Sequence, residues 1–143
     1  IETLGGQLYD EMPIAPKAGV AFHFSLRFAR AGTSREELAG AIRRVSLLSA
    51  ERSKGIKFYI DKNRMRLFSS NPEIGEARDK LGVEYKGQDI EIGFNSQYLL
   101  DFLTAVPSER VTFEIKDENS AVLLRPEGEE GLKNIYVLMP MKI

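Results

Sequence analysis

Two isolated helical segments, each followed by a run of short alternating segments, constrain the fold of this chain most strongly. We predict the first helix at about 34–50 and the second at 95–107, because apolar residues recur there every three or four positions. Elsewhere apolar and polar residues alternate, which is typical of half-buried strands. Lone helices among runs of strands indicate an α+β fold, with both helices on one face of a mainly antiparallel sheet. The two similar halves indicate two β-α-β-type repeats.

Each predicted helix has a capping residue at its start. Thr33 or Ser34 precedes the first helix, and Asn95 or Ser96 precedes the second, which Pro107 ends. The residues predicted to face the core are Leu38, Ile42, Val45 and Leu48 in the first helix, and Tyr98, Leu99, Phe102, Leu103 and Val106 in the second.

The predicted strands are short and are separated by polar turns. The strand at 20–31 is expected to stop at Gly32. Segments 56–60 and 65–68 are expected to form a hairpin, and a turn at 86–89 is expected to join 83–85 to 90–94. Pro72 and Gly75 favour a charged edge strand over a short helix for residues 73–81. The strands lie at 20–31, 56–60, 65–68, 73–81, 83–85, 90–94, 110–116, 120–125 and 134–142.

The composition excludes several classes of function. The 143 residues include no cysteine, which removes disulfides, thiolate nucleophiles and cysteine metal sites. The one histidine, His23, is expected on the polar side of a strand. A net charge of −1 argues against a domain that grips DNA by bulk charge. No apolar run approaches the ~20 residues of a membrane span. The lack of cysteine fits a reducing compartment, and we expect a cytoplasmic protein. Because the chain starts at Ile1, we expect a fragment or a processed product.

The chain carries no enzyme signature, so we expect no catalytic residue, metal ligand or cofactor. It lacks a Gly-rich phosphate loop, a G-x-S-x-G motif and an H-E-x-x-H motif. Three carboxylates, Glu73, Glu76 and Asp79, sit at roughly alternate spacing on the predicted edge strand. They either block unwanted strand pairing or form a patch that faces a partner. A second acidic group, within 126–131, is expected to be a solvated loop.

The last eight residues, 136–143, are almost wholly apolar, although chain ends are usually polar. Three uses are open for them: a buried strand, part of a binding groove, or an interface with another chain. Methionine repacks easily, so Met139 and Met141 would suit a groove that serves several partners.

Five phrases in order and spacing resemble one known family over about residues 20–143. They are Ser34-Arg35-Glu36-Glu37-Leu38, Arg43-Arg44-Val45-Ser46-Leu47-Leu48-Ser49, Asn71-Pro72-Glu73, Ile92-Gly93-Phe94-Asn95 with Tyr98-Leu99, and Tyr136-Val137-Leu138-Met139-Pro140-Met141. The family is the bacterial DNA polymerase III β subunit, the sliding clamp, and the match is to its third, carboxy-terminal domain. Residues 1–19 resemble the tail of the preceding domain more loosely.

The resemblance implies a non-enzymatic clamp fold built of two similar β-α-β units per domain. Family members form a head-to-tail dimeric ring around duplex DNA and raise processivity by keeping the polymerase at a high effective concentration. The partners implied are the polymerase III α subunit, the clamp loader and repair polymerases, which bind through short apolar peptides, and duplex DNA without sequence preference. A stand-alone clamp-like domain that binds peptides without encircling DNA is the alternative. A small enzyme of unrecognised type is a third reading that the missing motifs disfavour.

The resemblance also implies three sites. The peptide groove would use Pro16, Ala121, Val137, Leu138, Met139, Pro140 and Met141, unless this end is an ordinary core strand. The ring interface would use Leu47, Leu48, Glu73, Glu76 and Asp79. The DNA-facing surface would use Arg35, Arg43 and Arg44, which could equally be plain solvated arginines.

Overall fold

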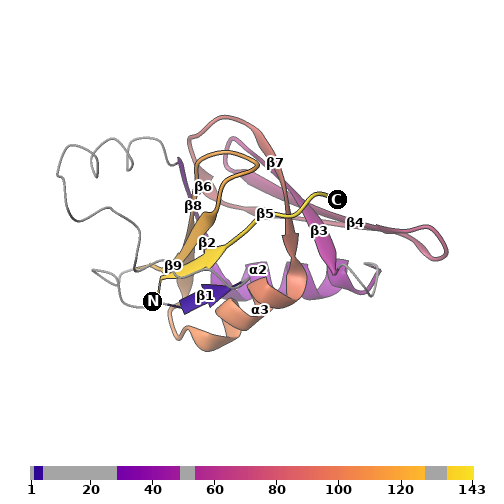
Figure 1. Ribbon diagram of the computed structural model, residues 1–143, viewed down its shortest axis with the longest axis horizontal. Helices are drawn as coiled ribbons and strands as arrows, with labels where there is room; N and C mark the ends of the chain where they lie inside the picture. The colour runs from indigo at the N-terminus through magenta and orange to yellow at the C-terminus, as the bar shows by residue number, and fades with distance from the viewer. Residues whose placement is uncertain (1, 5–28, 49–53, 128–134) are drawn as a thin grey trace.

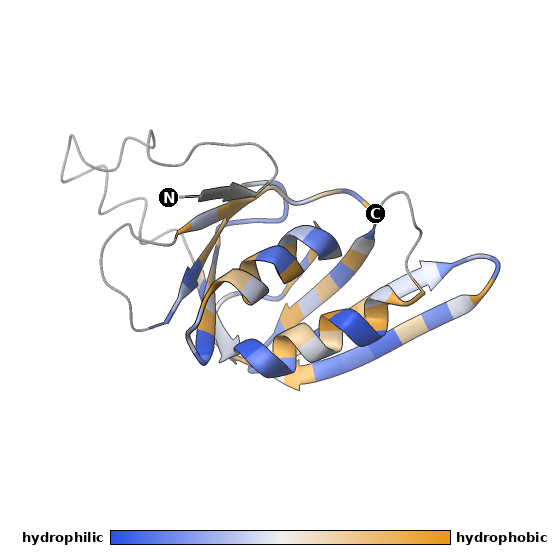
Figure 2. Ribbon diagram, turned by 90° about the horizontal axis from the view of Figure 1, so that it is seen from below, coloured by the Kyte–Doolittle hydropathy of each residue, from blue (hydrophilic) through white to orange (hydrophobic). Residues whose placement is uncertain are grey.

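Two helices lie side by side against two sheets (Figures 1 and 2). The structure, a computed structural model, describes residues 2–4, 29–48, 54–127 and 135–143. The α+β fold and the mainly antiparallel pairing predicted from the sequence are confirmed. The strands divide between two sheets, however, where the sequence pattern indicated one.

The larger sheet joins strands from both ends of the chain. Its neighbours pair antiparallel except β1 and β10, which are parallel, with Thr3 opposite Val137. The strands in spatial order are β1 (Glu2–Leu4), β10 (Tyr136–Leu138), β9 (Val122–Pro126), β8 (Arg110–Ile115), β2 (Ala29–Ser34) and β6 (Glu84–Tyr85).

The smaller sheet is antiparallel throughout and ends in an edge strand, as predicted. Its strands in spatial order are β5 (Gly75–Gly82), β4 (Arg64–Asn71), β3 (Gly55–Asp61) and β7 (Ile90–Asn95). The turn between β3 and β4 uses Asn63 at φ 60°, a conformation that asparagine tolerates. The β4–β5 hairpin projects beyond the rest of the molecule in Figure 1.

Both helices begin where their caps predict. Ser34 Oγ accepts a hydrogen bond from Glu37 N at the start of α2 (Arg35–Ser46). Asn95 Oδ1 accepts from Gln97 N and Tyr98 N at the start of α3 (Ser96–Ala105). Helix α2 ends at Ser46, earlier than predicted, because the residues after it form a turn.

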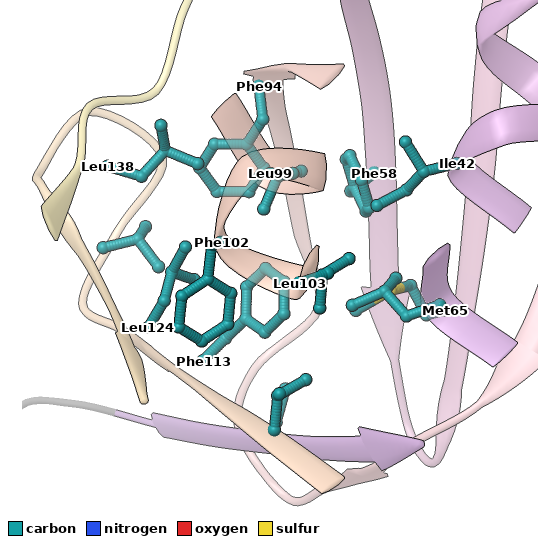
Figure 3. Packing of buried hydrophobic residues seen from close by; sticks show 14 of the residues in the cluster. Ile42, Phe58, Met65, Phe94, Leu99, Phe102, Leu103, Phe113, Leu124 and Leu138 are labelled. Atoms are coloured by element: carbon teal, nitrogen blue, oxygen red, sulfur yellow. The ribbon is translucent and has the colours of Figure 1, made fainter. Parts of the chain in front are cut away.

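The core fills the space between the helices and the two sheets (Figure 3). Leu38, Ile42 and Val45 of α2 are buried as predicted. At its centre Phe102 of α3 meets the ring of Tyr136 on β10 edge to face, with centroids 4.7 Å apart. An aromatic pair of this geometry adds stability beyond the area that it buries. Helix α3 is therefore fixed against the last strand of the chain.

Four local predictions were wrong. Strand β2 continues through Gly32 to Ser34, while most of the predicted strand 20–31 lies outside the described residues. Segments 83–85 and 90–94 do not form a hairpin, because β6 pairs with β2 and β7 with β3. The terminal strand ends at Leu138, well short of residue 142. Tyr98, predicted to face the core, is 40% exposed.

Candidate functional site

The chain end leaves the larger sheet at Leu138 and crosses to the smaller one. Leu138 belongs to the main core, whereas Val137 points to the opposite face of the sheet and packs with Leu123, Ile135 and the half-buried Ala121. Alternate residues of this strand therefore serve two different apolar clusters, as strand geometry requires. Pro16, the other residue predicted for a groove, lies outside the described part of the chain.

Beyond Leu138 the apolar side chains become accessible. Met139 is 37% exposed, and Pro140 and Met141 are partly buried. The backbone N–H of Met141 donates to the carbonyl oxygen of Gly93 at 2.8 Å. Gly93 stands two residues before the cap of α3, so the chain end passes the first turn of that helix.

Tyr98 lies in this first turn and adds a second exposed apolar side chain. The Phe102–Tyr136 ring contact places α3 beside β10, and Tyr98 precedes Phe102 by one turn. Tyr98 and Met139 therefore border one seam between α3 and the chain end, which we call the terminal seam. Sequence periodicity missed Tyr98 because it stands at the margin of the α3 apolar stripe, where helical spacing alone does not separate core from surface.

A hollow of about 400 Å³ lies over the smaller sheet and is lined in part by the last three residues of the chain, 141–143. Its wall includes an ion pair between Lys57 Nζ and Glu91 Oε1 at 3.0 Å. The hydrogen bond to Glu91, together with its charge, raises the pKa of Lys57 above its ordinary value. The hollow is lined by Lys57, Glu91, Ile92, Gly93, Glu118, Asn119, Met141, Lys142 and Ile143.

The second predicted site, the edge strand β5, has two exposed apolar side chains near it, both toward the start of the strand. Leu47, just after α2, is 80% exposed, as its position off the helical stripe suggests. Ile74, at the tip of the β4–β5 hairpin, is 65% exposed and was not singled out from the sequence, because a lone isoleucine in a polar turn gives no pattern. Leu48 is partly buried.

The three carboxylates assigned to this edge do not share one face. Glu73 precedes β5 in a turn, and a three-residue spacing puts Glu76 and Asp79 on opposite sides of a strand. Glu76 pairs with Arg78 at 3.2 Å. Asp79 turns toward α2, where Arg44 Nε donates to its Oδ2 at 2.6 Å. The expectation of alternate spacing was wrong, and the acidic patch is divided.

The Arg44–Asp79 pair makes a prediction for pH dependence. Burial opposes the charge of Asp79, but its hydrogen bonds to Arg44 and to Lys80 N outweigh burial and lower the pKa of its carboxyl. A lowered folded pKa stabilises the fold above the unfolded pKa, near 3.8, and this contribution is lost as pH falls through the lowered value. Asp79→Asn should remove about 0.5–1 kcal/mol at neutral pH and flatten the acid limb of chemical denaturation curves. An acid limb unchanged from wild type would contradict this role.

The predicted DNA-facing arginines differ in their exposure and in their hydrogen-bond partners. Arg35 is partly buried, and its guanidinium donates to the carbonyl oxygens of Ser108 at 2.7 Å and Leu103 at 3.3 Å. Arg35 thus caps the carboxy-terminal end of α3, where carbonyl groups lack hydrogen-bond partners within the helix. Arg44 is bound to Asp79. Within the described residues only Arg43 of these three is exposed without a partner.

We expect Arg35→Ala to lower the free energy of unfolding by about 1–3 kcal/mol, because it leaves carbonyl groups near the end of α3 without their charged donor. Arg43→Ala removes an arginine from the same helix and should change stability by less than about 0.5 kcal/mol. Urea denaturation of both variants checks the difference. Equal losses would show that Arg35 does not hold the two helices together.

A hollow of about 580 Å³ on the solvent face of the smaller sheet has no catalytic arrangement. Arg66 stacks on Tyr59 and Arg78 on Phe68. Both arginines also pair with carboxylates, Arg66 with Asp61 at 3.4 Å and Arg78 with Glu76. Within the described ranges no three His, Cys, Asp or Glu side chains converge on a metal position. No helix among them is long and apolar enough to cross a membrane.

Comparison with known proteins identifies one group of relatives. Residues 29–142 match the family model described as DNA polymerase III beta subunit, C-terminal domain. The beta sliding clamp of Pseudomonas putida is 37% identical over 109 residues, which are 76% of this chain and 29% of the relative. That of Escherichia coli K12 is 36% identical over 106 residues, 74% of this chain and 28% of the relative.

Solved structures agree. The sliding clamp of Pseudomonas aeruginosa bound to griselimycin superposes with a TM-score of 0.78 at 31% identity, covering 97% of this chain and 35% of that one. The DNA polymerase III beta subunit of Thermotoga maritima gives 0.79 at 27% identity, covering 97% and 35%. The chain therefore spans about three tenths of its curated relatives and slightly over a third of the solved clamps.

Proposed function

Because this chain belongs to the DNA polymerase III beta subunit family through that C-terminal domain, we propose that it acts as the third domain of a sliding clamp. In this role it is a non-catalytic part of the replication machinery, located in the cytoplasm at the nucleoid. Residues 20–143 form the domain, and 1–19 are the tail of the domain before it. The family match supports this division, because it covers residues 29–142 and leaves residues 1–19 outside.

The observation that carries the proposal is the terminal seam. Its exposed side chains, Met139 and Tyr98, are large and apolar, and each is next to a buried leucine in the chain, Leu138 before Met139 and Leu99 after Tyr98. Short peptides with apolar anchors bind such grooves, and methionine lets one groove accept several of them. The griselimycin complex of the P. aeruginosa clamp supports a ligand site on clamps of this family.

The test is titration of a labelled peptide from the tail of a replicative polymerase onto the chain. Met139→Ala and Tyr98→Ala should each weaken binding about tenfold, because anchors at the centre of an interface dominate its affinity. Tyr59→Ala removes a tyrosine from the solvent face of the smaller sheet and is the matched control. Equal affinity for all four proteins would contradict the groove, and absence of binding to wild type would remove this part of the proposal.

The edge of β5, together with Leu47 and Ile74, is proposed as one side of the ring interface. An unpaired edge strand offers backbone groups to a partner strand, and the exposed side chains offer apolar area. A head-to-tail ring pairs this surface with the first domain of another subunit. We therefore expect this chain alone to sediment as a monomer, and a stable ring-sized oligomer would contradict that assignment.

Contact with DNA is proposed to be weak in this domain. The exposed positions of α2 and α3 include Arg43, but also Glu36, Glu37 and Asp101. Few phosphate contacts suit a protein that slides. The alternative function, a stand-alone peptide-binding module, shares the terminal seam and lacks the ring. It would be favoured if the domain bound peptides yet never closed a ring within a longer clamp.

A further inference from the structure

We infer that Gly93 and Gly55 form the seat of the chain end, and that this seat positions the wall of the terminal seam. The inference rests on the proposed peptide groove and names the residues that hold it open for a partner. Gly93 lies on β7 and Gly55 on the neighbouring β3. Gly93 pairs with Lys57 and Gly55 with Asn95, so the two glycines are two residues apart in the register and on the same face. The two glycines leave a trough without side chains on the solvent face of the smaller sheet.

The chain end fills this trough closely. A Cβ atom built on Gly93 would clash with the carbonyl oxygen of Met141 and come within 2.8 Å of Ile143 Cδ1. A Cβ on Gly55 would also come within 2.8 Å of that methyl group. Real Cβ atoms essentially never approach other atoms below 3.0 Å. At Gly93 the obstacle is backbone, which does not swing aside as a flexible side chain does.

The seat fixes Met139 because it is the second of two anchors. The first anchor is Leu138, fully buried in the core. The second is the hydrogen bond from Met141 N to Gly93 O, 2.8 Å long. Only Met139 and Pro140 span the distance between them, and the ring of Pro140 fixes one backbone dihedral. If this hydrogen bond is lost, the backbone at Met139 is held only by Leu138. The Met139 side chain then no longer has a fixed position in the terminal seam.

The experiment is a double-mutant cycle between Gly93→Ala and removal of residues 141–143. In the full chain Gly93→Ala should weaken binding of the polymerase-tail peptide about tenfold and speed deuterium exchange at the Met141 amide about tenfold or more. Gly82→Ala is the matched control, because it lies in the same sheet and a Cβ there meets nothing within 4 Å. In the shortened chain Gly93→Ala should have no further effect on peptide affinity.

The cycle separates a seat from an ordinary strand position. If Gly93 mattered only for the strand itself, Gly93→Ala would change affinity equally with and without the chain end, and the inference would be wrong. Unchanged exchange at Met141 in Gly93→Ala would also overturn it. Deuterium exchange at the Met141 amide is measured without peptide, so it tests the seat even if the wild-type chain binds no peptide. Absence of peptide binding by wild type would contradict the proposed groove and not the seat.

Discussion

Replacing Phe102 with alanine is expected to lower the free energy of unfolding by about 3–5 kcal/mol, the range for truncating a buried aromatic side chain. Phe102 is fully buried and lies among Leu103, Phe113 and Leu124 in the core (Figure 3). Its ring also meets Tyr136, so the substitution loosens α3 from the last strand. Small domains have only about 5–15 kcal/mol of stability in total, so the variant should be close to unfolding.

Phe68→Ala is the matched control for this prediction. Phe68 is partly exposed on the solvent face of β4, where Arg78 covers its ring at 5.2 Å from the centroid. Its loss should cost about 0.5–1 kcal/mol. Urea denaturation followed by circular dichroism measures both variants. Similar losses for the two would show that the core is not organised around the contact between α3 and β10.

Leu47→Asp is expected to open the ring in a full-length clamp that carries this domain. Leu47 is 80% exposed here and belongs, with Ile74 and the edge of β5, to the surface proposed to face the neighbouring subunit. A buried, unpaired carboxylate at an interface is strongly unfavourable, so subunit association should weaken at least about thirtyfold. Sedimentation at several protein concentrations checks this.

Two further measurements make the Leu47 result specific. Lys116→Gln changes net charge by the same amount at an exposed position just after β8 of the larger sheet and should leave association unchanged. The thermal stability of the isolated domain should barely change in Leu47→Asp, because the side chain lies outside the core. A ring that withstands Leu47→Asp would remove this residue from the interface.

The local elements of the fold were predictable because their signals are local. Ser34 and Asn95 predict the starts of the helices that they cap, and Asn63 forms the turn between β3 and β4. The division into two sheets was not predictable in this way. Segments 83–85 and 90–94 have the same alternating pattern, and only pairing with distant strands decides that β6 joins β2 while β7 joins β3.

The candidate site was predictable in part for the same reason. The apolar chain end and the off-stripe Leu47 are visible as patterns, and family resemblance assigns them to a groove and an interface. Arg35 looked like a solvent-facing cation, since nothing nearby in the sequence shows that its partners are carbonyl groups some 70 residues away, at separations of 68 and 73. Gly93 looked like an ordinary strand glycine, because its role depends on where the chain end returns.

If this chain is the third domain of a clamp that encircles DNA, the full-length clamp should remain on a closed DNA circle. The most direct test is topological: the full-length clamp carrying this domain is loaded onto nicked circular DNA by a clamp loader, and its retention is followed by gel filtration. We predict retention on the circle and loss when the DNA is cut once, because a ring slides off a free end. Retention that survives linearisation, or that persists in Leu47→Asp, would contradict the account.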